Sequence, residues 1–186
     1  MKKILLIGLL SLSLFAQKAH TTKNVKDIDE IIVNIDTKKP INGIFKQYYP
    51  TGELQTEVEL KNGNGVRKAY YITGELKGEL PYKNGKGNGN WKEYYKTGKL
   101  KGETPYKNGE INGIKKTYYI TGKLKGEIQF KDGQVYGIAK DYYLTGEPKQ
   151  EIEFKYGKVI QGFKYTRDGK KTKMTNAHFH NMGLKY

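Results

Sequence analysis

The chain has 186 residues, of which 34 are Lys or Arg and 19 are Asp or Glu, so its formal net charge is +15. It contains no cysteine, which excludes disulfides, thiolate metal sites and a lipid-modified cysteine. Its only serines are Ser11 and Ser13, and its histidines are His20, His178 and His180. Both serines lie in a segment that we expect to be removed. Ser-His-Asp and Cys-His catalysis are therefore excluded in the mature chain, and we expect no enzyme.

The first sixteen residues have the pattern of a secretory signal peptide. Lys2 and Lys3 precede an apolar run of thirteen residues from Ile4 to Ala16. A helix of this length reaches about 20 Å, which is short of the ~30 Å hydrocarbon core of a bilayer. A positive start, a short apolar run and small residues are typical of an export signal. We therefore expect residues 1–16 to be removed after Ala16, leaving a mature chain without a transmembrane span in the periplasm, the cell envelope or the medium.

A repeat dominates the middle of the chain. Tyr-Tyr pairs recur with spacings of 22, 24, 24 and 24 residues, each followed by Thr-Gly and, eleven residues after Thr-Gly, by Asn-Gly or a variant. The unit reads G-x-x-K-x-Y-Y-x-T-G-[EK]-L-K-G-E-x-x-[YF]-K-[ND]-G. Five copies begin at residue 42, and a degenerate sixth ends at Gly169. We expect four segments: the signal at 1–16, an N-terminal linker with one strand at 17–41, the repeats at 42–169, and a basic C-terminal tail at 170–186.

Each half of the repeat has the length and pattern of a β-strand. The halves are about seven residues long and are bounded by glycine-containing turns, which is too short for stable helices. In residues 124–131, apolar residues and glycine alternate with charged or polar residues, as on a strand with one wet face. Thr-Gly and Asn-Gly supply residues that tolerate positive φ in hairpins. We predict an all-β fold, an elongated single-layer antiparallel meander of repeated β-hairpins, with about 10–12 strands and no helix in the mature chain.

The register of each hairpin has two solutions. A hairpin centred on Thr-Gly places Lys46 opposite Glu57, and the same Lys–Glu pairing recurs in all five repeats. Such cross-strand pairs contribute about 0.2–1 kcal/mol each. A type I turn with a glycine bulge, favoured by Pro50 at the second turn position, would instead shift each partner by one residue.

The string Y-Y-x-T-G-K-L-K-x-E resembles the bacterial variant of the MORN repeat. Residues 116–133, KTYYITGKLKGEIQFKDG, show it most completely. The likeness extends from residue 42 to about residue 169 and departs at Pro148, where the other repeats have Leu, and in the sixth copy, which lacks the Tyr-Tyr pair. The resemblance implies a repeat fold with a non-catalytic role. MORN arrays act as scaffolds that contact proteins or lipids, and bacterial members are often described as antitoxins.

The repeated tyrosines and lysines are candidates for an interaction face. Matching tyrosines recur every ~10 Å along a sheet, so their rings could stack on a partner or could form the core itself. The lysines could hold an anionic polymer or lipid, or could serve solubility alone. For an exported chain we expect a protein partner or an anionic envelope component rather than nucleic acid. The alternative is an antitoxin or immunity protein that neutralises a toxin. The candidate residues are Tyr71, Trp91, Tyr95, Tyr119, Lys77, Lys101 and Lys125.

We expect neither a cofactor nor a metal ion. His178 and His180 have H-x-H spacing, but a zinc or copper site needs further ligands, and the nearest acidic residue is Asp168. We therefore expect the tail to be a mobile or loosely docked end.

Export predicts a defined N-terminus. The intact mass of the protein isolated from the cell envelope should correspond to a chain that begins at Gln17, because cleavage follows the small residue at Ala16. Recovery of the full-length chain from the cytosol would contradict this prediction.

Overall fold

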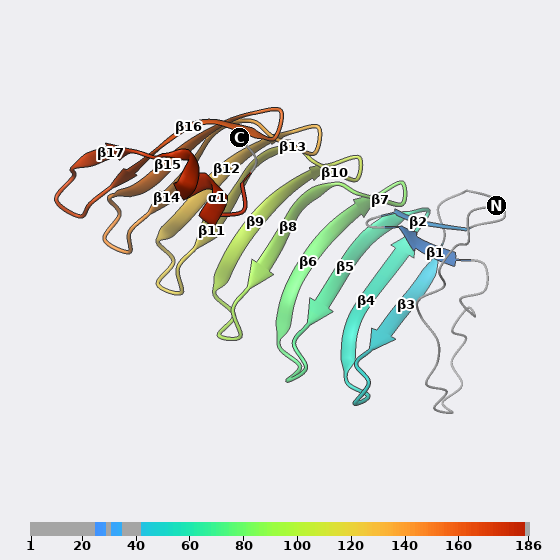
Figure 1. Cartoon of the computed structure of the whole chain (residues 1–186). Coiled ribbons are helices and arrows are strands. Elements are labelled where there is room, and N and C mark those ends of the chain that lie inside the picture. Colours follow the sequence, from blue (N-terminus) through green and yellow to red (C-terminus); the bar gives the residue numbers. More distant parts are fainter. Residues whose placement is uncertain (1–24, 29–30, 35–41, 185–186) are drawn as a thin grey trace.

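The computed structural model describes residues 25–28, 31–34 and 42–184. Its seventeen strands belong to one sheet, and all their pairings are antiparallel. Figure 1 shows a single curved layer in which successive hairpins lie side by side, with one short helix against its C-terminal part. The all-β antiparallel hairpin meander is therefore confirmed. The expected signal peptide lies outside the described residues.

The strands follow the repeat closely. They are β1 (Val25–Ile28), β2 (Ile31–Asn34), β3 (Gly43–Tyr48), β4 (Leu54–Lys61), β5 (Asn64–Tyr70), β6 (Leu76–Lys83), β7 (Lys86–Gly87), β8 (Gly89–Tyr94), β9 (Leu100–Lys107), β10 (Glu110–Ile111), β11 (Gly113–Tyr118), β12 (Leu124–Lys131), β13 (Gln134–Val135), β14 (Gly137–Tyr142), β15 (Pro148–Lys155), β16 (Lys158–Tyr165) and β17 (Lys171–Lys173). The helix is α1 (Asn176–Asn181).

Two expectations about these elements were wrong. The strands outnumber the 10–12 expected, partly because single bulge residues, Asn88, Asn112 and Tyr136, separate β7, β10 and β13 from the strands that they precede. In addition, β1 pairs with β2, and Ile31 of β2 lies opposite Lys86 of β7. The linker region therefore contains two strands where the sequence predicted one.

The expectation of no helix in the mature chain was also wrong, because the tail contains α1. At the start of α1, the backbone N–H of Thr175 donates to Nδ1 of His178 (3.1 Å). Phe179 of this helix is buried with Met174 against Ile152, Phe154 and Val159 of the last hairpin. The tail is therefore docked. A helix of six residues gives no periodic signal, and it forms because its apolar side chains are buried against the sheet.

The two kinds of turn differ in geometry. At Asn62-Gly63 both residues have positive φ, 50° and 72°, which is the two-residue hairpin that Asn-Gly favours. At the Thr-Gly turn, Gly74 (φ 93°) donates its N–H to the carbonyl of Tyr71 (2.9 Å), and the N–H of Tyr71 donates to the carbonyl of Glu75 (2.9 Å). The glycine is therefore a bulge residue after a tight turn, and the same bonds recur at every Thr-Gly.

The observed register combines both predicted solutions. The glycine bulge shifts the pairing next to the turn, so Tyr70 lies opposite Leu76. Lys77 then has no partner in the register, and beyond it Ala69 lies opposite Gly78. This second bulge cancels the first, so Lys68 and Glu79 are paired after all. The equivalent pairs of the other hairpins are Lys46–Glu57, Lys92–Glu103, Lys116–Glu127 and Lys140–Glu151.

The two faces of the sheet have different compositions. The core face carries Val58, Leu80 and Trp91, and the ladder face carries the alternating lysines and glutamates just described. On the core face, Val58, Leu60, Leu80 and Tyr82 form one buried cluster. The second is the C-terminal cluster under α1. A single sheet thus buries one face, and α1 covers that face where the array ends, as terminal caps do in repeat proteins.

The last Asn-Gly position predicts a stabilising substitution. Tyr156 has φ 50°, where the other repeats have Asn or Asp. Asn tolerates this conformation better than Tyr, so Tyr156→Asn should raise the free energy of unfolding by roughly 0.5–1 kcal/mol. Urea denaturation measures the change. Tyr136→Asn is the control, because that exposed tyrosine is not among the described residues with positive φ. Equal effects of the two substitutions would contradict the explanation.

Candidate interaction surfaces

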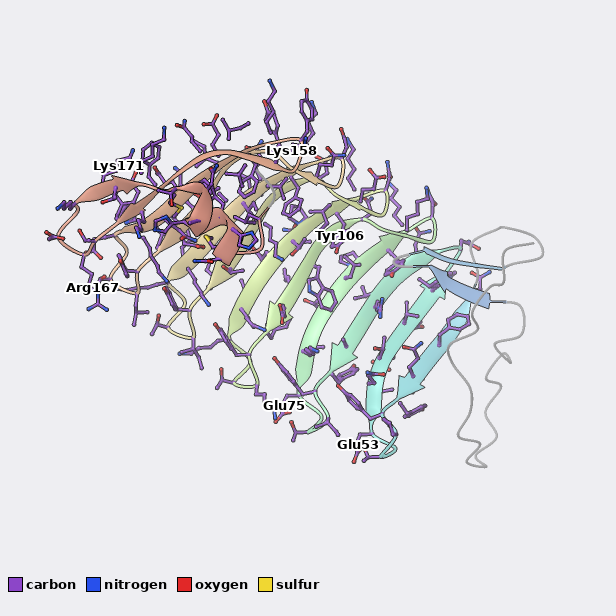
Figure 2. The ribbon with its side chains drawn as sticks, in the orientation of Figure 1. Glu53, Glu75, Tyr106, Lys158, Arg167 and Lys171 are labelled. Carbon is purple, nitrogen blue, oxygen red and sulfur yellow. The ribbon has the colours of Figure 1, made fainter. Side chains whose placement is uncertain are left out.

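The three candidate lysines occupy one structural position. Lys77, Lys101 and Lys125 are each the unpaired residue of the second bulge in a hairpin. Their strands are fixed on both sides of the bulge, so these side chains recur once per hairpin along the Thr-Gly edge of the sheet. Figure 2 shows this edge at Glu53 and Glu75, opposite the edge that carries Lys158. The repeat spacing correctly indicated a shared position, and the bulge is its physical cause.

Two of these lysines lie over tyrosine rings. The Nζ of Lys77 is 5.8 Å from the ring centroid of Tyr71, and the Nζ of Lys125 is 5.8 Å from that of Tyr119. Lys96 approaches the Tyr71 ring as well, at 5.6 Å. Such cation–π contacts contribute about 0.5–1 kcal/mol at exposed sites. The structure therefore brings two of the candidate tyrosines, Tyr71 and Tyr119, together with two of the candidate lysines.

Lys101 differs from its equivalents because it has an acidic partner. Its Nζ donates to Oε1 of Glu93 at 2.6 Å. This hydrogen bond raises the pKa of the Lys101 ammonium above its usual value. Lys101 is half-buried, whereas Lys77 and Lys125 are exposed. The latter two are therefore better placed to meet a partner.

The second tyrosine of each pair ties its repeat to the next. The hydroxyl of Tyr71 donates to the backbone carbonyl of Tyr94 (2.8 Å). Tyr95 and Tyr119 donate in the same way to Tyr118 and Tyr142 (2.7 Å each). The hydroxyls of the candidate tyrosines are thus used within the fold, and their rings are half-buried.

In the second to fifth pairs, the first tyrosine bonds to the ladder face of the preceding hairpin. The hydroxyl of Tyr70 donates to Glu57 (2.6 Å), and that of Tyr94 donates to Glu79 (2.8 Å). Each of these glutamates also lies between two lysines in the register, as Glu79 does between Lys68 and Lys92. Burial, followed by the bond to glutamate, raises the pKa of Tyr70 and Tyr94 to about 12.

Trp91 lies on the core face. It is half-buried and packs against the N-terminal cluster. A Cβ placed on Gly78 would overlap its ring, so glycine is required at that position. The Trp91 ring therefore contributes to the core. Neither of the two principal hollows is lined by Trp91 or by a candidate lysine.

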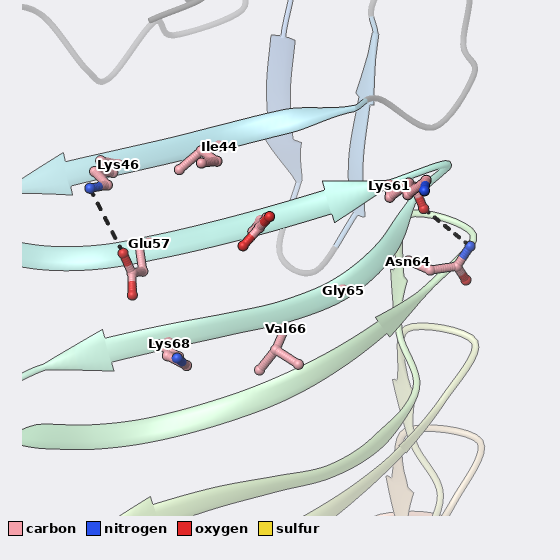
Figure 3. A pocket seen from close by; sticks show the side chains of 9 residues that line it. Ile44, Lys46, Glu57, Lys61, Asn64, Gly65, Val66 and Lys68 are labelled. Atoms are coloured by element: carbon pink, nitrogen blue, oxygen red, sulfur yellow. Dashed lines mark hydrogen bonds and ion pairs between the residues drawn. The ribbon is translucent and has the colours of Figure 1, made fainter. Parts of the chain in front are cut away.

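Both hollows lie on the ladder face. The larger, of about 450 Å³, lies over β3–β5 between Ile44 and Val66, with Lys46, Glu57 and Lys68 on its floor and rim (Figure 3). The second, of about 360 Å³, is lined by residues that include Ile114, Ile138, Glu127 and Lys140. The two hollows therefore offer the same chemistry in different repeats: exposed branched apolar side chains beside paired charges.

The described part of the chain presents no cluster of three or more metal-ligating side chains. His178 and His180 lie on α1, and Nε2 of His178 is 2.8 Å from Nζ of Lys164. Across residues 25–28, 31–34 and 42–184, no helix combines the length and apolar character that crossing a bilayer requires.

The sequence analysis missed two sets of surface residues. Lys149 is a bulge residue equivalent to Lys125, and Pro148 obscured the match. Tyr136 and Ile160 are exposed where Asn88 and Asn112 stand in earlier repeats. A comparison of the repeats position by position would have found both sets.

The tyrosine–glutamate bonds predict a loss of stability in alkali. Tyr70, Tyr94 and Tyr142 have pKa values raised to about 12 in the fold, whereas unfolded tyrosine titrates near pH 10. Their contribution to stability should be complete below about pH 10 and should fall as the pH rises to about 12. Urea denaturation between pH 8 and pH 12 tests this. Replacing all three by Phe should flatten the pH dependence, and an unchanged slope would contradict the assignment.

Comparisons with known proteins agree with this geometry. The family described as MORN repeat variant matches residues 41–62, 64–84, 88–108, 111–132 and 136–156. Repeats of this kind form modules often involved in binding. No curated protein matches the chain.

Two solved structures show weak likeness. One is described as accessory secretory protein 1,2 and 3 in Streptococcus pneumoniae; it is 15% identical with a TM-score of 0.22, and the match covers 75% of this chain and 22% of that one. The other is a GtfA/B complex bound to UDP and GlcNAc, 11% identical with a TM-score of 0.21, covering 88% and 32%. This chain thus spans less than a third of either, and neither likeness supports an argument. The family match, in contrast, covers more than half of the 186 residues in five consecutive units, and the chain therefore belongs to the MORN repeat variant family.

Proposed function

We propose that this protein is an exported, non-catalytic repeat module that binds an anionic partner, either a protein or an envelope polymer, along its Thr-Gly edge. The observation that carries the proposal is that the second bulge leaves a lysine unpaired in each of the three central hairpins, and that two of these lysines, Lys77 and Lys125, lie beside a tyrosine ring. Equivalent hairpins lie two strands apart, so these groups recur about every 10 Å. Such a row suits an extended partner with regularly spaced negative groups.

The distribution of charge supports the same edge. The repeats at residues 64–87, 88–111 and 112–135 carry net charges of +3, +2 and +3, whereas the flanking repeats carry −1 and 0. A local excess of one sign attracts partners of the other sign and raises association rates. The three candidate lysines come from these central repeats, so the edge and the charge coincide.

The proposal also explains why the lysines are placed in bulges. A lysine within the pairing register lies beside glutamates on the ladder face, as Lys68 does with Glu57 and Glu79. The bulge removes Lys77 and Lys125 from that register. Their charge is therefore less neutralised by the chain itself and is available to a ligand.

A triple substitution tests the proposal. Replacing Lys77, Lys101 and Lys125 together by Gln should weaken binding to an anionic probe, poly-glutamate or polyphosphate, by about tenfold or more, and more than any single replacement. The control replaces Lys83, Lys107 and Lys131 together by Gln. These lysines lie in the same repeats at the opposite edge, directly before the Asn-Gly or Asp-Gly turns. The control variant should stay within about 0.5 kcal/mol of the parent in stability, whereas the triple variant also loses two cation–π contacts of about 0.5–1 kcal/mol each and the Lys101–Glu93 bond. Isothermal titration calorimetry measures the affinities.

Salt provides a second measurement. Binding between exposed charges is screened beyond about 8–10 Å at physiological ionic strength, so affinity should fall as salt rises. A single Tyr→Ala change that abolishes binding, with the triple lysine variant still bound at high salt, would contradict the proposal and would indicate a discrete pocket. A pull-down from envelope fractions with the mature chain would then identify the natural ligand, including a toxin if the protein is an antitoxin.

A further inference from the structure

An exposed apolar patch lies on the ladder face of the C-terminal repeats and at the adjoining edge that carries their Asn-Gly and equivalent turns. Its residues, with the exposed fraction of each, are Ile114 (49%), Tyr136 (44%), Ile138 (49%), Tyr156 (72%) and Ile160 (56%). We call these five residues the C-terminal patch. Clusters of exposed apolar side chains on otherwise polar proteins mark interaction sites. This one is separate from the lysines of the Thr-Gly edge.

The register places the two isoleucines on one surface, and Tyr156 lies in the turn between β15 and β16. Ile114 lies opposite Gln129, and Ile138 lies opposite Glu153 of the next hairpin, so both isoleucines are on the ladder face. The N–H of Tyr136 donates to the carbonyl of Gln129 (2.9 Å), which sets this bulge residue beside the same row. Ile160 is the unpaired residue between Gln161 and Val159 at the next bulge. The hollow of about 360 Å³ lies between Ile114 and Ile138.

The patch departs from the repeat in ways that the fold does not need. The bulge position holds Asn64, Asn88 and Asn112 in the earlier repeats, but Tyr136 and Ile160 in the later ones. Tyr156 adopts a positive φ, where Asn or Asp serves elsewhere, although its side chain is the most exposed of the large hydrophobic residues. A residue that breaks a local rule without a packing benefit indicates a function outside the chain.

Beside the patch, the charges form a self-complementary row. The order across the sheet is Lys116, Glu127, Lys140, Glu151, one residue from each of β11, β12, β14 and β15. A two-fold axis parallel to the strands and midway between β12 and β14 reverses this order in a second copy. Lys140 of one copy then faces Glu127 of the other, and Lys116 faces Glu151. All four contacts are between opposite charges.

We infer that the C-terminal patch docks on the same face of a second copy of this chain. Two sheets pack face to face at about 10 Å, and the same axis brings the two Ile138 side chains to within about one strand spacing, ~4.8 Å. The patch and the four charges span about 25 Å by 20 Å, or about 500 Å² per copy, at the lower end for a specific interface. The dimer is therefore weak, and it forms at micromolar concentration or above.

The opposite face is not available for this contact in the same repeats, because α1 and Met174 cover Ile152 and Phe154 there. An anionic ligand fits the C-terminal patch poorly, because the repeat that contributes Tyr136, Ile138 and Tyr156 has no net charge. The association therefore goes beyond the proposed function and does not depend on it.

Sedimentation velocity of the mature chain tests the inference without any ligand. Between about 1 and 200 μM in about 0.15 M NaCl, the weight-average mass should rise from monomer toward dimer. Ile138→Lys should raise the dissociation constant at least tenfold, because it places two ammonium groups near the axis. Ile44→Lys is the matched control: it makes the same change on the ladder face at an equally exposed isoleucine, outside the patch, and should leave the dissociation constant unchanged.

A charge exchange provides the second test. Lys140→Glu alone places two glutamates opposite each other at both Glu127–Lys140 contacts between the copies, so it should weaken the dimer. Glu127→Lys alone should weaken the dimer as well, because it places two lysines opposite each other there. The double variant restores opposite charges and should recover association. Circular dichroism confirms that each variant is folded. A chain that stays monomeric at 200 μM, an equal effect of Ile44→Lys and Ile138→Lys, or a double variant no better than the single ones would overturn the inference.

Discussion

The fold depends on hydrogen bonds that pass from one repeat to the next. In the four Tyr-Tyr pairs after the first, one tyrosine hydroxyl reaches the backbone of the following hairpin and the other reaches a ladder-face glutamate of the preceding one. A single hairpin is at best marginally stable in water, and a single-layer sheet has only one face to bury. The tyrosines add bonds between hairpins that the backbone pairing alone does not supply, and so couple neighbouring repeats.

Bulges reconcile this coupling with the charge pattern. The glycine of the Thr-Gly turn shifts the register by one residue, and the bulge at Lys77 or its equivalents shifts it back. One lysine and one glutamate therefore remain opposite each other at the same position of every Thr-Gly hairpin. The same bulge leaves Lys77, Lys101 and Lys125 outside the pairing, and Lys77 and Lys125 lie beside a tyrosine ring. One backbone feature thus serves both the stability of the array and its proposed binding edge.

The ends of the array differ from its middle for a physical reason. Internal hairpins are flanked by near-identical neighbours, whereas the last described hairpin is followed by α1, which with Met174 and Phe179 covers its core face. The ladder face of the same repeats remains open and carries Tyr136, Ile138 and Ile160 in exposed positions. The C-terminal repeats therefore combine a covered core face with an apolar ladder face, which makes them the natural place for self-association.

The sequence by itself determined the repeat and its hairpins, because strand periodicity and Asn-Gly or Thr-Gly turns are local properties, and it offered the Lys–Glu pairing as one of two registers. It also indicated that Lys77, Lys101 and Lys125 are equivalent. It did not determine that Trp91 packs over Gly78, that Lys101 bonds to Glu93, or that the tail folds into α1. These features depend on contacts between residues from different strands or elements, and on bulges whose effect appears only when both strands are placed. Tertiary structure alone decided which face each side chain occupies.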